Sequence, residues 1–322
     1  MAVEMIGDSG MEYQLKQTYD HRLLMRATKD LVYNRYAEKK PIPKRGGKSI
    51  EFRRLEKLTM TNGSYTLTEG TYPAETQATY SKVECTISQY GQWSKISDVL
   101  NFQGFDPVIA DFVDLYGDAM GEGLDNIPRD ALSSCTTIQY ADSATVVGTS
   151  GAGAVGSGNF MDAAELLEAR RTLRRNGAKP AEDGKFVCFL HPDNTKDLYE
   201  DSDILEAFKD AAPRDSKNPI FTGVLGDWMG MRFVETNNLR IRSSYGMSGA
   251  DVYECHVFGK GAYGTSDLSA MAARTIIHPP SIEGGPLEQY STVGWKAALG
   301  ACLLNNDFIV QINCGSSRSL SA

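Results

Sequence analysis

The feature that most constrains the fold of this chain is the long segment 56–80, which joins two stretches of alternating polar and apolar residues. These stretches, 49–55 and 81–100, have the period of two that is typical of strands. The segment between them is far longer than the roughly two to five residues that usually join the strands of a hairpin. A ribbon that reaches away from its own core is marginal in water. We therefore expect this long loop to lie on another surface, most economically that of a second copy.

The long loop and its first strand carry side chains that would suit a contact between copies. Tyr65, Leu67 and Tyr72 are too far from their own strands to be buried in their own core. Aromatic residues are prominent among the anchors of protein interfaces. Cations on the first strand would fix the register of the contact by pairing with acidic residues of the neighbouring copy. The candidate assembly contacts are Arg53, Arg54, Tyr65, Leu67, Glu69 and Tyr72.

Cations are concentrated just before and within the first strand, although the chain has a net charge of −8. They are Lys39, Lys40, Lys44, Arg45, Lys48, Arg53 and Arg54. The acidic overall charge argues against an extended nucleic-acid surface. An acidic patch on a neighbouring copy is favoured over nucleic acid as the partner, because the segment adjoins the long loop and lacks a dense aromatic platform.

The strongest helical pattern begins at Asp106, an N-cap residue followed by Pro107 in the first turn. Apolar residues then recur every three to four positions, at Ile109, Val113, Tyr116, Met120, Leu124 and Ile127. Three glycines, Gly117, Gly121 and Gly123, lower the helix propensity by about 1 kcal/mol each relative to Ala. We expect close packing against that face, with Gly117, Gly121 and Met120 as the contacts. Pro128 should kink or end the helix.

Other segments predict a further helix before the ribbon and an α/β domain after the long helix. The helix is expected over 21–39, after a mobile arm in the first twenty residues. From Asn159 to about Gly264, helix and strand patterns alternate. They comprise a helix capped by Asn159 or Asp162 and ended by Gly177, a strand at 186–190, a helix near 194–198, and strands within 231–238 and 252–259. The segments 291–304 and 308–313 are expected to form a terminal strand pair.

The segment "GAGAVG", residues 151–156, matches the G-x-G-x-x-G fingerprint of a dinucleotide-binding turn. The fingerprint requires a helix directly after the third glycine, and here the next helix starts later. A flexible connector is therefore favoured over a cofactor site. No motif for nucleophilic catalysis or phosphate binding is present. We expect no catalytic residues, no cofactor and no enzyme activity.

The six cysteines are scattered without a C-x-x-C pair, and we expect reduced thiols that behave as small buried hydrophobes. The four histidines are widely separated and lack the spacing of zinc ligands. Cys255 and His256, which are adjacent in a strand pattern, are more readily explained by core packing than by metal binding. No metal site is expected.

Five stretches in a fixed order resemble a known family. They are "PIPKRGGKSIEFRRLEKL" (41–58), "TLTEGTYP" (66–73), "QYGQWSKISDVL" (89–100), "FGKGAYG" (258–264) and "PLEQYSTVGWKAALGACLLNNDFIVQIN" (286–313). Together they are similar to the major capsid proteins of tailed phages, and within these to the N-four-like major capsid family. The resemblance implies an α+β chain with the Hong Kong 97 capsid fold, with an N-terminal arm, an extended loop, a spine helix, a peripheral domain and an axial domain.

The resemblance also implies a division of the chain and a function. The expected ranges are 1–48 for the arm and linker, 49–100 for the extended loop with its strands, 101–136 for the spine helix of the peripheral domain, 137–265 for the axial domain and 266–322 for the return to the peripheral domain. Copies would form the hexamers and pentamers of an icosahedral head shell. The alternatives are a cellular nanocompartment shell of the same fold and, much less favoured, a cofactor-binding enzyme.

The expected partners follow from the same resemblance. The chain would associate with itself and with scaffolding, portal and decoration proteins. It would enclose double-stranded DNA without sequence-specific binding and have no contact with a membrane. It would be assembled in the bacterial host cytoplasm and reside in the virion.

Overall fold

The computed structural model describes most of the chain. The described residues are 31–41, 48–56, 58, 69–71, 75, 77–103, 108–142, 155, 158–181, 183–204, 206, 227–246, 249–266, 273–280, 287 and 289–317. The expected arm, the expected helix cap at Asp106 and the segment 151–156 apart from Val155 lie outside them. No helix in the described part is both long enough and apolar enough to cross a bilayer.

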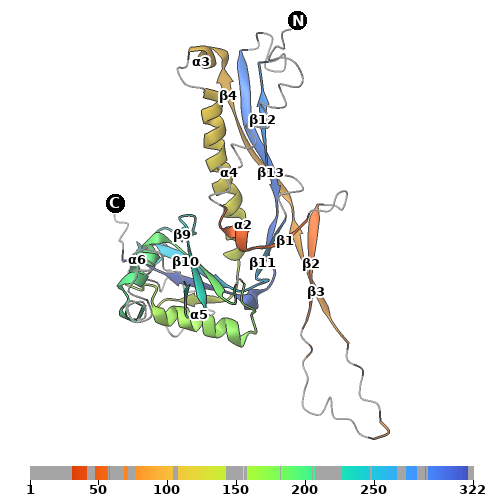
Figure 1. Ribbon diagram of the computed structural model, residues 1–322, viewed down its shortest axis with the longest axis vertical. Coiled ribbons are helices and arrows are strands. Elements are labelled where there is room, and N and C mark those ends of the chain that lie inside the picture. The colour runs from red at the N-terminus through yellow and green to blue at the C-terminus, as the bar shows by residue number, and fades with distance from the viewer. Residues whose placement is uncertain are drawn as a thin grey trace.

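A long helix and a long sheet form the elongated upper part of the molecule in Figure 1. The elements are the helices α3 (Asp98–Gln103) and α4 (Val108–Leu132) and the strands β4 (Ser88–Ser97), β12 (Arg274–His278) and β13 (Tyr290–Leu299). The sheet is antiparallel, in the order β12-β13-β4. Val113, Met120 and Leu124 of α4 share a core with Val293 and Trp295 of β13. The predicted apolar face of the helix is the face that packs on the sheet.

Of the two outcomes expected at Pro128, the end of the helix is wrong, because α4 continues through Pro128 to Leu132, while a kink stays a prediction. A proline inside a helix costs about 3 kcal/mol or more, since it removes one backbone donor and crowds the preceding turn. The last turn is held from outside the helix. Leu132 is fully buried in the larger core, and Arg129 donates from Nη1 to Oδ1 of Asn238 over 3.1 Å. These contacts offset the cost of the proline.

A second, mixed sheet forms the body at the lower left of Figure 1. Its strands are β5 (Ile138–Tyr140), β6 (Phe186–Leu190), β7 (Asp227–Trp228), β8 (Met231–Glu235), β9 (Ile241–Arg242), β10 (Val252–Phe258) and β15 (Ile309–Cys314). The order is β5-β15-β10-β6-β8-β7, with β9 also paired to β10. Every residue of β6, β10 and β15 is buried. The alternating helix and strand pattern predicted for this region is confirmed.

The helices α5 (Ala163–Arg175) and α6 (Pro192–Glu200) belong to the same body. The predicted cap at Asp162 is confirmed, because its side chain accepts a hydrogen bond from the N–H of Glu165. The helix stops where Gly177 adopts a φ of 74°, a conformation that favours glycine. α5 begins well after Gly156, as the sequence indicated.

The expected pairing of the two C-terminal strands is wrong. β13 pairs with β12 and β4, whereas β15 lies between β10 and β5 in the other sheet. The two strands are separated by β14 (Ala301–Leu303) and the short 3-10 helix η5 (Asn306–Phe308). Because every residue of β15 is buried, the strand is stabilised at the centre of a sheet more than at the edge of a hairpin. The range 266–322 therefore contributes to both bodies, and the division into domain ranges stays a prediction.

The expected helix over 21–39 is described only as α2 (Tyr33–Tyr36), and its last residues form a strand instead. This strand, β1 (Glu38–Lys40), runs parallel to β11 (Tyr263–Ser266). Asp125 of α4 accepts hydrogen bonds from the first two N–H groups of α2, which a short helix cannot satisfy internally. Tertiary contacts thus decide the structure of this segment more than its helical spacing does.

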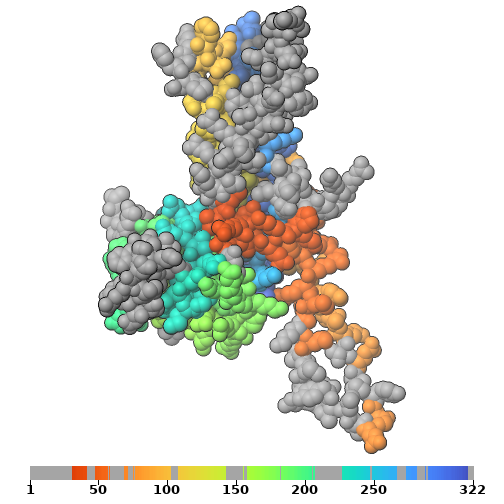
Figure 2. Space-filling view, viewed as in Figure 1, coloured from red at the N-terminus to blue at the C-terminus, as the bar shows by residue number. Residues whose placement is uncertain are grey.

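The remaining strands form a ribbon that projects from the junction of the two bodies (Figure 1). β2 (Ser49–Leu55) and β3 (Tyr80–Thr86) are antiparallel, and they pair only with each other among the described strands. The strand predicted at 49–55 is confirmed as β2. The single strand predicted over 81–100 is instead divided into β3 and β4, which belong to different sheets, and its last residues begin α3. Figure 2 shows the ribbon leaving the body as a narrow extension.

Candidate assembly surface

The root of the ribbon is packed against the body. Ile50 and Cys85 are opposite each other in the ribbon, and both are buried. The ring of Phe52 lies against Gly264 of β11, where an added Cβ would come within 2.7 Å of the ring. A side chain at position 264 would therefore displace the ribbon. These contacts fix the direction in which the ribbon leaves the body.

The far end of the ribbon exposes an apolar pair. Leu55 and Tyr80 are directly opposite each other, and they are 58% and 68% exposed. Leu58, just beyond the ribbon, is also exposed. Contacts within its own chain bury little of this pair. Exposed apolar side chains on an unpaired ribbon are typical of a surface that another molecule covers.

Among the predicted contacts of the ribbon, Arg53 and Arg54 are exposed on β2. Arg53 donates from Nη2 to Glu51 over 3.0 Å, and the hydrogen bond from Arg53 lowers the pKa of Glu51. On the opposite strand, a hydrogen bond to Glu84 raises the pKa of Lys82. Ion pairs this exposed contribute little to stability, so they can be exchanged for partners on another copy.

The long loop itself is described at only a few positions. Glu69 is exposed and stands in a turn with Gly70, whose φ is 83°. Tyr65, Leu67 and Tyr72 lie outside the described residues. Their burial on a neighbouring copy stays a prediction.

The cations expected to meet an acidic neighbour are exposed wherever they are described, and some have partners within the chain. Lys40 donates to the backbone carbonyl of Glu51, and its Nζ lies 5.5 Å from the centroid of the Phe52 ring. Lys44 and Arg45 lie outside the described residues. The acidic patch on a neighbour stays a prediction.

The predicted contacts of the long helix are buried within the chain. Gly117, Met120 and Gly121 all lie on the covered side of α4, and Met120 is part of the core with β13. The expectation of close packing is wrong for Gly123, because an added Cβ there would meet no atom within 4 Å. Gly123 is two positions after the buried Gly121, and this spacing places the two residues on opposite sides of the helix.

Sequence reasoning missed two exposed apolar side chains at separate places on the elongated body, Trp93 and Phe102. Trp93 lies on the face of β4 that is turned away from α4, with Nζ of Lys95 5.6 Å from its ring centroid. At the end of β4, Phe102 of α3 is 90% exposed, and it borders a hollow of about 710 Å³ with Ile277 and Pro279. The alternation through 89–97 contained the signal for Trp93, because it places this residue opposite the helix-facing side chains.

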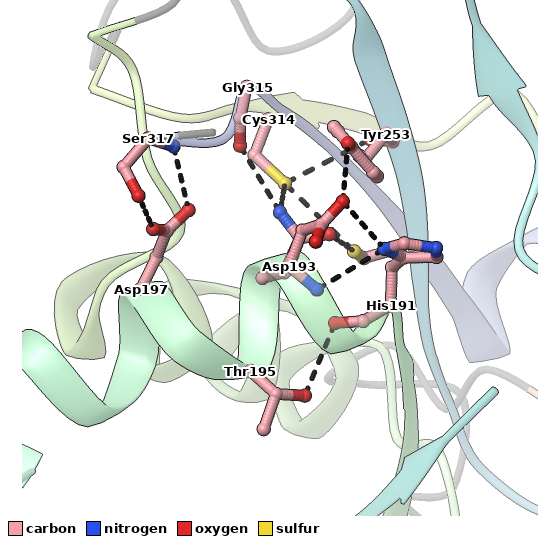
Figure 3. A network of polar contacts seen from close by, with 10 residues as sticks. His191, Asp193, Thr195, Asp197, Tyr253, Cys314, Gly315 and Ser317 are labelled. Carbon is pink, nitrogen blue, oxygen red and sulfur yellow. Dashed lines mark hydrogen bonds and ion pairs between the residues drawn. The ribbon is translucent and has the colours of Figure 1, made fainter. Parts of the chain in front are cut away.

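The last described residues are fastened to α6 (Figure 3). Asn194 donates from Nδ2 to the carbonyl of Gly315 over 3.1 Å, and the N–H of Ser317 donates to Asp197 over 3.1 Å. Nearby, the hydroxyl of Tyr253 donates to Asp193 over 2.9 Å. Asn194 and Asp197 thus hold the C-terminal segment on α6, and Asp193 joins α6 to β10, so the network has a structural role.

Cys255 and His256 of β10 are fully buried, in agreement with core packing. Burial lowers the pKa of His256 to about 3, with smaller contributions from Arg240 and Arg129. All six cysteines are free thiols. Within the described ranges, no three His, Cys, Asp or Glu side chains come together as metal ligands would.

Comparisons with known proteins agree with this architecture. Residues 141–263 match a family model described as "Phage capsid protein". This chain is similar to the capsid of cyanophage Pam1, and the likeness covers 86% of this chain and 87% of the capsid chain. The sequences are 18% identical, and the TM-score is 0.71. The capsid of Helicobacter pylori bacteriophage KHP30 is similar over 86% and 87%, with 14% identity and a TM-score of 0.67.

A virus-like particle from Pyrococcus furiosus is also similar, over 93% of this chain and 99% of its own, with 13% identity and a TM-score of 0.50. No curated protein sequence matches the chain. The matched structures cover most of both chains, and the Hong Kong 97 type of α+β capsid fold expected from the sequence is confirmed.

Proposed function

We infer that this chain is a phage major capsid protein whose copies associate into a head shell. The family match and the capsid fold support this function. The observation that carries it within the structure is the ribbon, which is packed at its root and exposes Leu55 and Tyr80 at its far end. A side-chain pair of this kind is stabilised only when another surface covers it.

Assembly would use the ribbon as the donor of a contact that its own chain cannot make. Such a contact joins two different surfaces, and repeated contacts of this type close into rings when the rotation between copies permits it. The exposed side chain of Trp93, on the face of β4 turned away from α4, is suitable as part of a receiving surface, since it is accessible. Permanent assemblies commonly bury roughly 2,000 Å² or more in each contact, which is far more than one ribbon pair provides. The long loop would supply further area.

We also propose the form of the shell, the partners of the chain and its location. The rings would be hexamers and pentamers of an icosahedral shell around double-stranded DNA, and the chain would act without enzyme activity. The net charge of −8 supports enclosure without tight or sequence-specific DNA binding. Scaffolding, portal and decoration proteins would complete a tailed-phage head that is assembled in the host cytoplasm and resides in the virion.

A cellular nanocompartment is the second candidate, and the likeness to the virus-like particle from Pyrococcus furiosus favours keeping it. The two functions differ in what the shell encloses. A phage head encloses a genome, whereas a nanocompartment encloses protein cargo.

Electron microscopy of the purified full chain tests the assembly function. Closed shells of uniform diameter are expected, and a chain that stays monomeric at high concentration would contradict the proposal. Particles isolated from a phage lysate should contain nuclease-protected DNA. Shells that contain a cargo protein and no DNA would favour the nanocompartment.

A further inference from the structure

Two pairs of cysteines lie close together, in different settings. Cys255 of β10 and Cys314 of β15 have sulfur atoms 3.9 Å apart, and both residues are fully buried. Cys85 of β3 and Cys302 of β14 share a hydrogen bond between their thiols. The second pair is at the root of the ribbon, where β3 meets the body.

A glycine brings the two strands of the second pair together. A Cβ added at Gly300, directly before β14, would lie 2.6 Å from the carbonyl oxygen of Thr86 and 3.1 Å from the sulfur of Cys85. The close approach is therefore possible only without a side chain at this position. Cys302 follows two residues later, opposite Gly264 of β11. The sulfur of Cys85 thus faces β14 close to the position of Cys302.

The two thiols of this pair are not equivalent. The hydrogen bond from Cys302 lowers the pKa of Cys85, while the same bond raises the pKa of Cys302. A hydrogen bond between two thiols stabilises the thiolate of the accepting sulfur, so this pair can supply one thiolate. Although Cys85 is only 1% exposed, Cys302 is half-buried, so the pair lies at the edge of the solvent.

We propose that Cys85 and Cys302 are a redox pair that closes to an intramolecular disulfide when the protein meets hydrogen peroxide. The thiolate of one cysteine attacks one peroxide oxygen, the O–O bond breaks, and hydroxide leaves and is protonated to water. The thiol of the other cysteine then attacks the sulfur of the sulfenic acid, the S–O bond breaks, and a second water leaves with the thiol proton. Two thiols lose two electrons, and one peroxide is reduced to two waters.

The disulfide would fasten the ribbon to the body. Cys85 is the cross-strand partner of Ile50, and these two residues form the buried part of the ribbon. A covalent bond to β14 at this point fixes the angle at which the ribbon leaves. The use of such a lock rests on the proposed function, because a shell assembled in a reducing cytoplasm meets oxidising conditions after release.

The buried pair is an internal control. Asn194 donates from Nδ2 to the sulfur of Cys314 over 3.3 Å, and the hydrogen bond with Cys255 together with burial raises the pKa of Cys314 well above its ordinary value. Neither thiol of this pair reaches the solvent, whereas Cys302 is only half-buried. A thiol that oxidant cannot reach is unreactive, so oxidation should distinguish the two pairs.

Peptide mapping after peroxide treatment tests the proposal. The reduced full chain is incubated with hydrogen peroxide, the remaining thiols are alkylated, and the protease digest is analysed by mass spectrometry. Wild type and the Cys314→Ala control should give a peptide containing Cys85 joined to one containing Cys302. Cys85→Ser and Cys302→Ser should not. The wild-type digest decides the question even if a variant fails to fold, since absence of the joined peptide would overturn the proposal.

Two further readouts separate this proposal from the assembly function. Nonreducing electrophoresis should show a monomer, and a disulfide-linked dimer formed through Cys85 or Cys302 would contradict the intramolecular bond. Oxidation should raise the melting temperature of wild type but leave that of Cys302→Ser unchanged, and equal shifts would contradict the lock. A joined peptide in a chain that never forms shells would uphold the redox pair and reject the capsid function.

Discussion

Asp125 of α4 accepts a hydrogen bond from the backbone N–H of Tyr33 over 2.8 Å, although the two residues are 92 positions apart in the sequence. The same carboxylate accepts from Asn34 and from Nδ2 of Asn238. One buried side chain therefore joins the N-terminal segment, the long helix and the body that contains β8. Burial raises the pKa of Asp125 from 3.8 to about 6, and the hydrogen bonds that the carboxylate accepts limit the rise.

The pKa of Asp125 predicts a component of stability that grows as the pH falls. The folded state binds the proton more tightly than the unfolded chain, so protonation favours folding between about pH 6 and about pH 4. Relative to Asp125→Asn, the free energy of unfolding of wild type should rise by roughly 1 kcal/mol from about pH 8 to about pH 5. Urea unfolding at both pH values measures this change. Asp111→Asn, at an exposed position of the same helix, is the control. If the free energy of unfolding changed with pH identically in both variants, Asp125 would not be the group responsible.

His256 predicts a pH dependence of the opposite sign. Its pKa in the folded state is about 3, because the ring is fully buried, against an ordinary value of 6.5. The unfolded chain takes up a proton below about pH 6.5 that the folded state does not, which should cost about 2 kcal/mol of stability at about pH 5. His256→Leu should lose this acid sensitivity, while His278→Leu, at an exposed site, should retain it. Equal acid sensitivity of wild type and His256→Leu in urea unfolding would refute the prediction.

Two glycines of the elongated body predict opposite responses to alanine. A Cβ at Gly294 of β13 would lie 2.7 Å from the carbonyl oxygen of Gln92 and 2.8 Å from Cβ of Trp93, whereas a Cβ at Gly123 would meet nothing within 4 Å. Gly294→Ala should lower the free energy of unfolding by about 1–3 kcal/mol. Gly123→Ala should raise it by up to about 1 kcal/mol, because alanine favours the helix. Thermal unfolding measures the stability of both variants. Equal effects on the free energy of unfolding would contradict the close approach of β4 to Gly294 of β13.

The sequence was most informative where a pattern is local. Alternation predicted β2 and the presence of strand structure after the long loop, and Asp162 with Gly177 marked the ends of α5. The resemblance, carried by stretches that are far apart in the chain, predicted the capsid fold that the comparisons confirm.

The errors have a common physical cause, which is contact between distant segments. Pro128 remains inside α4 because Leu132 and Arg129 are held by the other body. Residues 38–40 form a strand because β11 offers a free edge, and β15 leaves β13 because β10 and β5 accept it. The exposed side chains of Trp93 and Phe102 were missed for the same reason, since exposure depends on what the fold leaves uncovered.

The ribbon carries the central claim that the chain assembles through contacts between copies. Replacing the exposed pair, in the variant Leu55→Ser/Tyr80→Ser, removes apolar area that a neighbour would bury and leaves the packed root of Ile50 and Cys85 intact. Leu167→Ser is the matched control, because Leu167 is an exposed leucine of α5 in the other body. A deletion of 63–71 tests the loop beyond the ribbon in the same way.

Sedimentation velocity, read beside circular dichroism, is the most direct measurement. Wild type and Leu167→Ser should sediment as shells, while Leu55→Ser/Tyr80→Ser and the loop deletion should sediment as subunits with the wild-type circular dichroism spectrum. Shells of normal size and heat resistance from both the double variant and the deletion would contradict a role for the ribbon between copies. A subunit that has lost its circular dichroism signal would instead mean that the ribbon stabilises its own chain, which contradicts the account equally.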